Sequence, residues 1–467
     1  MNTLNPRTGI FDYQYNSLNN NELALLSQQM KVQQKEWFLN GIEYRIAAMQ
    51  AWKIVLQAES EAIVEALTLD TGRKAESVLE MNLLLSSIDR WCGISKDFFA
   101  QKEEKTTAIP FITIRQELVP YSLVGVISPW NFPLLLSVID TIPALLSGCA
   151  VVVKPSEVTP RFIEPIAKTI QAVPALSAIF SYVAGDGILG ANLLQHVDLV
   201  CFTGSVATGK KVYANMAAQL KPCFLELGGK DAALIFEGAD LDNTASAILW
   251  GSCVNCGHSC LSIERVYVEK TIFNAFLALL IEKTKHIKLA YPTVNDGQIG
   301  PVISEKQVAI INEHLRDALE KGAKIEYGNA QCQAIDGGFW CLPTILTNVN
   351  HDMKIMTEET FGPIIPLMPF DSEAEAIDFA NATIFGLSGA VFSESVEKSA
   401  QIAMLMDAGA ISLNDCALTA IIHDGEKNAF RQSGIGGTRM GPAAIKRFMR
   451  QKALVMKNQV VASPWWW

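Results

Sequence analysis

The sequence has no long apolar stretch that runs without interruption. Its longest apolar run, residues 137–153, contains Asp140, Pro143 and Gly148. A bilayer-spanning helix needs about 20 largely apolar residues, so we expect no membrane-spanning segment. The first 20 residues are polar and rich in asparagine, and they lack the basic and then apolar layout of a secretion signal. These absences favour a cytoplasmic location and argue against a membrane partner.

Basic residues are fewer than acidic residues. Lys and Arg number 38 against 48 Asp and Glu, which gives a formal net charge of −10, and no basic block is present. Nucleic acids bind to concentrated basic surfaces, so we do not expect a nucleic-acid partner. Internal repeats and low-complexity segments are missing too. With 49% hydrophobic residues, a chain of 467 residues predicts roughly two to four packed domains.

Cysteine is present, but the ten cysteines are spread through long globular stretches. That spread favours reduced thiols over a disulfide framework. Cys253, Cys256 and Cys260 lie close together around His258. This composition permits a metal or cluster site, but no second paired ligand group is present to complete one, so we expect no metal. The alternatives are one reactive thiol in a crowded loop, or three small core side chains. Composition alone favours the core.

The order of apolar patterns predicts an α/β fold. Residues 21–99 have the spacings of three and four that are typical of helices. Residues 106–120 are β-branched and partly alternating, which predicts a strand or hairpin that leaves the main body. From residue 121 short apolar strands alternate with helices, which indicates a doubly wound parallel sheet. Further strand and helix patterns at residues 265–413 predict a second α/β domain. The predicted strands are 123–127, 150–153, 181–184, 199–202, 232–236, 265–268, 324–325, 364–368 and 389–392.

Polar residues follow several of these strands, at the edge where a doubly wound sheet binds its ligands. Asn131 lies in a loop after a strand and can donate to a developing oxyanion, although an Asn that caps a turn is the commoner case. Glu226 lies in an apolar run beside two glycines, where burial would make it a usable base near neutral pH. The alternative is a structural carboxylate paired with Lys230. Gly204 and Ser205 open a helix, which suits a phosphate.

Together these segments resemble the aldehyde dehydrogenase superfamily. The resemblance covers nearly the whole chain, from about residue 70 to residue 457, and its pieces occur in the family's order. Glu226 and Cys260 are 34 residues apart, which is similar to the family's separation of base and nucleophile. The pieces are Asp70-Thr-Gly-Arg73, Ser128-Pro-Trp-Asn-Phe-Pro133, Val153-Lys-Pro-Ser-Glu157, Phe202-Thr-Gly-Ser205, Leu225-Glu-Leu-Gly-Gly-Lys230, Gly257-His-Ser-Cys260, Glu359-Thr-Phe-Gly-Pro363 and Ser433-Gly434.

The resemblance implies a role for each catalytic position. Cys260 is the nucleophile that forms a thiohemiacetal and then a thioester, and Glu226 is the base that activates water to hydrolyse the thioester. Asn131 and the Cys260 backbone N–H form the oxyanion hole. Two other functions stay open. One is an acylating enzyme in which coenzyme A releases the thioester, and the other is an inactive structural relative. The presence of Glu226 argues against the first, and the three residues together argue against the second.

The resemblance also implies a nicotinamide cofactor. Lys154 and Glu157 match the positions that hold the adenosine ribose, and a carboxylate there repels a 2′-phosphate. We therefore expect NAD, with NADP as a possible second cofactor. Glu359 matches the carboxylate on the nicotinamide ribose, and Phe361 is either the nearby ring or a core residue. The full set of expected cofactor residues is Ser128, Pro129, Trp130, Lys154, Ser156, Glu157, Gly204, Ser205, Leu227, Glu359 and Phe361.

The family fold implies domain limits and an assembly. Residues 1–101 and 121–228 are expected to form a Rossmann-like NAD-binding domain, and residues 229–432 a catalytic domain. Residues 102–120 and 433–467 are expected to form a small β oligomerisation element and a C-terminal tail, which implies a homodimer or homotetramer. The tail ends in Trp465, Trp466 and Trp467, which we expect to pack on the chain's own surface or at a subunit interface.

Three departures from the family pattern affect the site. His258 replaces the usual Gln; it either lowers the pKa of the neighbouring thiol as a cation or fills the Gln position, and we favour the second. Residues 426–431 replace the common Pro-Phe-Gly-Gly turn at the substrate mouth, and residues 435–441 lack the usual carboxylate, so a proton relay through a second Glu is not expected. The family's apolar tunnel positions, here Phe132, Leu136 and Ile139, favour an uncharged, apolar or semi-apolar small-molecule aldehyde.

Overall fold

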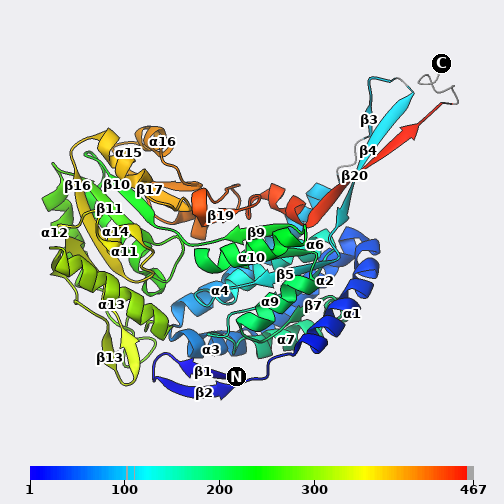
Figure 1. The fold of residues 1–467 in the computed structure, drawn as a ribbon, viewed down its shortest axis with the longest axis horizontal. Helices are drawn as coiled ribbons and strands as arrows, with labels where there is room; N and C mark the ends of the chain where they lie inside the picture. The colour runs from blue at the N-terminus through cyan, green and yellow to red at the C-terminus, as the bar shows by residue number, and fades with distance from the viewer. Residues whose placement is uncertain (101–103, 110, 460–467) are drawn as a thin grey trace.

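The computed structural model describes residues 1–100, 104–109 and 111–459, and two mixed, mainly parallel sheets form its two lobes (Figure 1). The first sheet has the order β19-β9-β8-β5-β6-β7. All of its neighbouring strands are parallel except the short β19, which pairs antiparallel with β9. Its strands are β5 (Leu123–Ile127), β6 (Ala150–Lys154), β7 (Phe180–Tyr182), β8 (Leu199–Thr203), β9 (Cys223–Glu226) and β19 (Gly434–Ile435).

The expected N-terminal helices are present and bury one face each. Leu23, Met49, Trp52 and Leu56 are fully buried, which is why an apolar residue recurs every three or four positions. These helices share one core with the first sheet. The helices of this lobe are α1 (Asn20–Leu39), α2 (Gly41–Ala58), α3 (Ser60–Thr71), α4 (Ala75–Ala100), α5 (Leu135–Val138), α6 (Thr141–Ser147), α7 (Ile163–Gln171), α8 (Pro174–Ser177), α9 (Gly187–His196) and α10 (Val206–Ala218).

The second sheet has the order β12-β15-β16-β11-β10-β17-β18, with only β12 antiparallel to its neighbour. A second core packs on it. Its strands are β10 (Asp231–Ile235), β11 (Ile263–Glu269), β12 (Lys324–Tyr327), β15 (Thr344–Thr347), β16 (Ile364–Phe370), β17 (Ser388–Phe392) and β18 (Ala410–Leu413). The helices of this lobe are α11 (Leu241–Cys253), α12 (Phe273–Thr284), α13 (Glu305–Glu320), α14 (Lys354–Thr357), α15 (Glu373–Asn381) and α16 (Val396–Ala403). The predicted α/β fold with a second α/β unit is therefore confirmed, and β7 ends two residues before the predicted limit.

A third sheet projects from the body as an arm (Figure 1). It has the order β20-β4-β3, formed by β3 (Glu104–Thr106), β4 (Ile112–Pro120) and β20 (Met449–Lys457). The hairpin predicted for residues 106–120 is β3 with β4, and β20 pairs with the whole length of β4. Two small hairpins, β1 (Asn2–Asn5) with β2 (Ile10–Gln14) and β13 (Gln333–Ile335) with β14 (Gly338–Trp340), complete the strands of the described residues.

The C-terminal segment contributes to the first lobe before it enters the arm. Gly434 and Ile435 pair with the end of β9, and Ala444, Ile445 and Phe448 are buried in the core of the first sheet. The three terminal tryptophans lie outside the described residues. Within the part of the chain that the structure describes, no helix is both long and apolar enough to cross a bilayer.

Candidate active site

A contorted loop between α11 and β11 presents Cys260. After α11 comes a short turn, η1 (Val254–Gly257), in which Asn255 and Cys256 both have a φ of 56° and Gly257 has a φ of 69°. A Cβ atom on Gly257 would lie 2.3 Å from the carbonyl carbon of Gly362. Only glycine fits so close to another backbone at positive φ. The loop is therefore packed against the strand end near Gly362, and this packing sets the position of the thiol.

The three clustered cysteines have different surroundings. Cys253 and Cys256 are buried in the core of the second sheet. Cys260 is partly exposed and lines a cavity of about 200 Å³ together with Asn131, Glu359 and other residues. In the described residues, no group of three or more His, Cys, Asp or Glu side chains is arranged to hold a metal ion. Access to the cavity therefore distinguishes Cys260 from its two neighbours.

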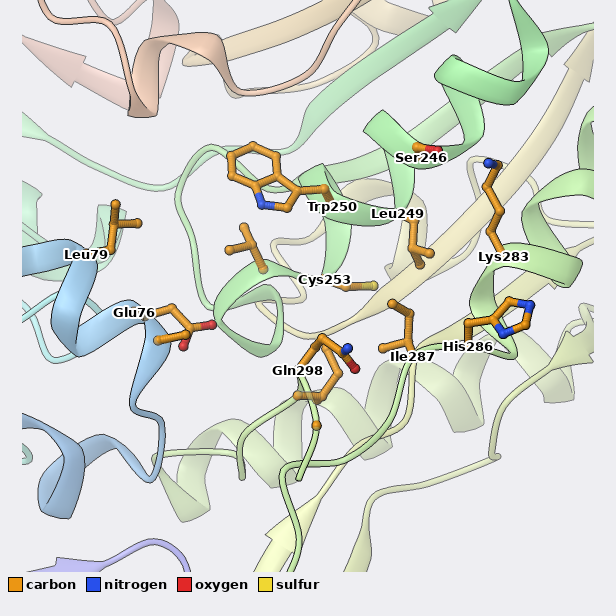
Figure 2. A pocket seen from close by; sticks show the side chains of 14 residues that line it. Glu76, Leu79, Ser246, Leu249, Trp250, Cys253, Lys283, His286, Ile287 and Gln298 are labelled. Carbon is orange, nitrogen blue, oxygen red and sulfur yellow. The ribbon is translucent and has the colours of Figure 1, made fainter. Parts of the chain in front are cut away.

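A larger cavity of about 630 Å³ lies on another side of α11 (Figure 2). Figure 2 shows Glu76 and Leu79 of α4 facing Trp250 and Cys253 of α11 across it, with Gln298 nearby. None of the predicted site residues lines this space. Size is thus a poor guide here, because the smaller cavity is the one that holds the expected nucleophile and cofactor residues.

Asn131 is held against the loop that carries Cys260. Its Nδ2 donates to the carbonyl oxygen of His258 at 2.9 Å, which leaves a second N–H of the amide for a ligand. Asn255 Nδ2 donates to the carbonyl oxygens of Asn131 (2.9 Å) and His258 (3.0 Å). The Cys260 backbone N–H donates no hydrogen bond to any described residue. Two N–H groups are thus available near the thiol, as an oxyanion hole requires.

The Asn131 loop is also anchored from α4. Arg73, just before this helix, donates to the carbonyl oxygen of Asn131 and stacks on Phe132, with its guanidinium carbon 5.0 Å from the ring centroid. Glu80 Oε2 accepts from the backbone N–H groups of Leu134 and Leu135, each at 2.9 Å. Burial raises the pKa of Glu80 to about 7, against the opposing effect of Arg73. Sequence reasoning missed the roles of Arg73, Glu80 and Asn255, because nothing local to these residues shows what they contact.

The Cys260 thiol lies close to several titratable groups. Burial, followed by the carboxylate of Glu226, raises the pKa of Cys260 to about 12. Lys427 opposes this effect, and Glu359 and Asp231 add to it. The free thiol is therefore protonated at neutral pH, so its attack requires transfer of the thiol proton.

His258 does not act as a cation beside the thiol. Its side chain is fully buried, and burial lowers the pKa of His258 to about 3. The ring packs edge-on to Trp130, with centroids 5.1 Å apart, and stacks on Phe361 at 5.9 Å. Neither ring nitrogen has a hydrogen-bond partner among the described residues. The hypothesis that an imidazolium lowers the thiol pKa is therefore wrong, and His258 is a neutral packing residue at the usual Gln position.

Glu226 ends β9 with its side chain 18% exposed. It is not paired with Lys230, whose Nζ binds Glu264 Oε2 at 2.6 Å and Thr360 Oγ1 at 3.0 Å. The alternative of a structural Glu226–Lys230 pair is therefore wrong. The nearest cation is Lys427 Nζ, 4.0 Å from Glu226 Oε1. Lys427 comes from the segment that replaces the family's usual turn, and sequence reasoning did not single it out.

The expected cofactor residues form two groups. Seven of them line the same cavity as Cys260, namely Pro129, Trp130, Gly204, Ser205, Leu227, Glu359 and Phe361. Burial raises the pKa of Glu359 to about 8, and its Oε1 accepts from the Gly229 N–H at 3.1 Å. Ser205 caps the N-terminus of α10. The helix start and the thiol therefore share one cavity.

The second group lies at the ends of β5 and β6. Ser128 is buried, and its N–H donates to the carbonyl oxygen of Lys154 at 3.2 Å. Lys154 Nζ contacts Glu157 Oε2 at 3.1 Å, and Glu157 remains 43% exposed. Ser156 Oγ accepts from the Val158 N–H at 3.2 Å. The ion pair presents a carboxylate near the surface, at the carboxyl edge of the sheet.

A buried charge cluster lies behind Glu226, where the sequence lacks the family's carboxylate. Arg439 donates to Asp140 Oδ2 at 2.6 Å and to Thr203 Oγ1 at 2.7 Å, and Arg447 donates to Asp140 Oδ1 at 3.1 Å. The two arginines lower the pKa of Asp140 despite its burial. The carboxylate of this cluster, Asp140, is thus paired with both arginines.

The fold and this cavity define a class of protein: a two-lobed α/β protein with a dinucleotide-type cleft that ends at a cysteine thiol. Comparison with known proteins is consistent with this class. The model of the aldehyde dehydrogenase family matches residues 1–454. The chain belongs to the aldehyde dehydrogenase family.

Individual relatives agree with this assignment. The chain is 34% identical over 422 residues to 4,4'-diapolycopene aldehyde oxidase of Methylomonas sp, covering 88% of this chain and 78% of that protein. The structure of the putative aldehyde dehydrogenase PutA from Anabaena variabilis is similar, with a TM-score of 0.98, 52% identity and coverage of 100% of this chain and 99% of that one. A betaine aldehyde dehydrogenase from Staphylococcus aureus, solved in complex with NAD+, has a TM-score of 0.93, 28% identity and coverage of 100% and 96%.

Proposed function

We propose that the protein oxidises an aldehyde to a carboxylic acid with NAD and water, through a covalent intermediate on Cys260. The observation that carries the proposal is the single cavity that contains Cys260, Asn131, Glu359 and the start of α10. A helix N-terminus binds phosphate and a nearby carboxylate binds ribose hydroxyls. The residues present therefore fit a dinucleotide whose reactive ring reaches the thiol, and the family relative from Staphylococcus aureus was solved with NAD+.

The first step is attack of the Cys260 sulfur on the aldehyde carbon. A carbon–sulfur bond forms, the thiol proton passes to Glu226 or solvent, and the carbonyl oxygen becomes an alkoxide. The second Asn131 Nδ2 N–H and the Cys260 backbone N–H hold this alkoxide. The cofactor, when bound, accepts the hydride that leaves the same carbon. The Cys260 adduct then becomes a thioester.

Hydrolysis of the thioester completes the proposed cycle. Glu226, after releasing to solvent any proton taken from the thiol, accepts a proton from water, and the resulting hydroxide attacks the thioester carbon. The carbon–sulfur bond breaks, the carboxylic acid leaves, and the Cys260 thiolate takes the proton back from Glu226. Lys427, 4.0 Å from the carboxylate, and the nearby Arg439 are the cations that face Glu226. A thioester released by coenzyme A would need no such base, which is why hydrolysis is preferred over the acylating alternative.

A panel of aldehydes with NAD, followed by NADH absorbance, tests this proposal. Cys260→Ser is expected to form no NADH, because a hydroxyl is a far weaker nucleophile than a thiolate. Glu226→Gln is expected to give a burst of about one NADH per chain and then a slow phase, because the thioester accumulates. Full activity of Cys260→Ser would refute the central role of the thiol. Rapid turnover of Glu226→Gln with coenzyme A, and none of the wild type with water, would establish the acylating reaction instead.

The same proposal includes the domain roles, the assembly and the location. We assign NAD binding to the lobe of residues 1–101 and 121–228, catalysis to residues 229–432, and oligomerisation to the projecting β3-β4-β20 sheet, giving a homodimer or homotetramer. The reactive thiol and the ten unpaired cysteines suit a reducing compartment, so we place the protein in the cytoplasm.

A further inference from the structure

Lys427 is a buried cation beside the proposed nucleophile. Its side chain is 7% exposed, and the closest carboxylate oxygen, Glu226 Oε1, is 4.0 Å from Nζ. This distance is longer than a hydrogen bond, and Nζ donates no hydrogen bond to any residue that the structure describes. An ammonium carries three donors. A desolvated charge with unused donors calls for a further polar partner.

The backbone holds Lys427 in this position. Its N–H donates to Thr438 Oγ1 at 3.0 Å. On either side, the Gly441 N–H donates to the His423 carbonyl oxygen at 3.1 Å, and the Ala443 N–H donates to Glu426 Oε1 at 3.1 Å. Three contacts thus attach the segment to the chain around residue 440. These contacts fix the backbone from which the Lys427 side chain extends.

Lys427 does not line the cavity that holds Cys260 and the expected cofactor residues. It lines a second cavity of about 650 Å³, together with Phe224 and Phe430. Cys260 and Ala429, which is two residues from Lys427, pack against the same small apolar cluster of Leu261, Leu387 and Ala417. An aldehyde bound to Cys260 must direct its hydrogen toward the nicotinamide, so its carbon chain must leave the thiol outside the cofactor cavity. The apolar cluster and Lys427 are the groups placed to meet this chain.

The groups around Lys427 carry more positive than negative charge near neutral pH, so an added anion would be stabilised there. Three carboxyl groups, Glu226, Asp231 and Glu359, and the imidazole of His423 lie near this centre, and Arg439 adds a cation. Burial raises the pKa of Asp231 to about 7 and that of Glu359 to about 8, so both lose negative charge near neutral pH. Burial lowers the pKa of His423 to about 4, so its ring is neutral there. Arg439 is paired with Asp140, which also binds Arg447, so the two carboxylates Glu226 and Asp140 face three cations, Lys427, Arg439 and Arg447.

We propose that Lys427 determines substrate specificity by binding a carboxylate of the substrate, so that the preferred substrates are short aldehydes with a carboxylate at the far end. This inference rests on the proposed function, and it replaces the expectation of an uncharged aldehyde. An aldehyde with a cationic group is disfavoured, because its charge would lie beside a desolvated ammonium.

Three aldehydes of similar size test the inference: succinic semialdehyde, its uncharged methyl ester, and the cationic betaine aldehyde. For the wild-type protein, we expect kcat/KM for the semialdehyde to exceed that for the ester by about tenfold or more. Lys427→Met should raise KM for the semialdehyde by about tenfold and leave KM for the ester within about threefold. Lys427→Arg should retain part of the preference. Lys270→Met is the matched control, because Lys270 is 67% exposed and pairs with Asp371 away from these cavities, and it should change neither KM.

The outcomes separate this inference from the proposed function. An equal loss of kcat on semialdehyde and ester in Lys427→Met, with both KM values unchanged, would show that Lys427 acts only through Glu226. Wild-type oxidation of the ester without preference for the semialdehyde would overturn the inference and leave the proposed function standing. If no aldehyde yields NADH, the proposed function itself fails. If Lys427→Met does not fold, the inference is tested by the Lys427→Arg variant and by the wild-type ratio of kcat/KM for the semialdehyde to kcat/KM for the ester.

Discussion

The Cys260 thiol is protonated at neutral pH, because burial and the Glu226 carboxylate raise its pKa to about 12. The reactive species is the thiolate, so the free protein is poorly reactive toward electrophiles near pH 7.

Alkylation of Cys260 measures this pKa directly. Since the thiol is protonated below its pKa, the thiolate fraction rises about tenfold for each pH unit up to about 12. We expect the rate of iodoacetamide modification of the Cys260 peptide, followed by mass spectrometry without cofactor, to rise about tenfold per unit between about pH 7 and about pH 10. Cys260→Ser provides the blank. A plateau near pH 8 would contradict the structure's electrostatics.

Glu157 is a second residue whose effect is measurable alone. Its carboxylate, paired with Lys154 and 43% exposed, would lie close to a 2′-phosphate and repel it. Glu157→Ser should raise kcat/KM for NADP by about tenfold or more and change that for NAD less, because Lys154 is then free to bind the phosphate. The measurement is NADPH and NADH formation with one aldehyde. An unchanged NADP value would place the adenosine ribose elsewhere.

At the scale of the element, the loop between α11 and β11 carries the proposed nucleophile. The backbone forces the path of this loop. Asn255 and Cys256 have φ near 56°, and Gly257 packs against the backbone of Gly362. Backbone in this region is strained for residues with a side chain and persists only when its surroundings demand it. Asn255, one of these two residues, donates to the carbonyl oxygens of Asn131 and His258. The same strained residue therefore also aligns the two loops that carry the expected oxyanion donors.

Gly257→Ala tests the loop. The added methyl group would meet the Gly362 backbone at 2.3 Å in a positive-φ conformation, so the loop must shift. A displacement of about 1 Å is expected to lower kcat/KM by about 100-fold. Gly93→Ala is the control, since Gly93 lies inside α4 with no atom within 4 Å of the added group. Normal kcat/KM in a folded Gly257→Ala protein would show that the contact does not position Cys260.

At the scale of the whole molecule, the projecting β20-β4-β3 sheet is an arm with few contacts to its own body (Figure 1). β20 is an edge strand, and its Val455 is 64% exposed. Edge strands with apolar side chains pair readily with another chain. This exposed edge is the basis for the oligomerisation role proposed for the arm.

Val455→Asp is expected to lower the mass of the assembly, because a carboxylate would be desolvated at a subunit interface. The mass is measured by size-exclusion chromatography with light scattering. Met404→Asp, which changes a residue 85% exposed on another part of the surface, should leave the mass unchanged. An unchanged mass for Val455→Asp would remove this part of the arm from the interface.

Local patterns were enough to predict the N-terminal helices, nine of the strands and the order of the site segments, but not β9, β15, β18 or β20. Apolar spacing predicts helices because each helix buries one face. Short apolar runs between turns predict parallel strands because those strands are covered on both sides. Cys260, Glu226 and Asn131 could be named in advance because each sits in a short motif whose neighbours are also fixed in order.

The sequence by itself thus determined the α/β fold, the family and the expected nucleophile. Only the tertiary structure decided how Cys260 differs from Cys253 and Cys256, that His258 is neutral, and that Lys427 stands beside Glu226. These properties depend on burial and on distances between segments far apart in the chain, such as the 4.0 Å between Lys427 and Glu226. Local sequence carries no record of such distances, because packing of the complete chain sets them.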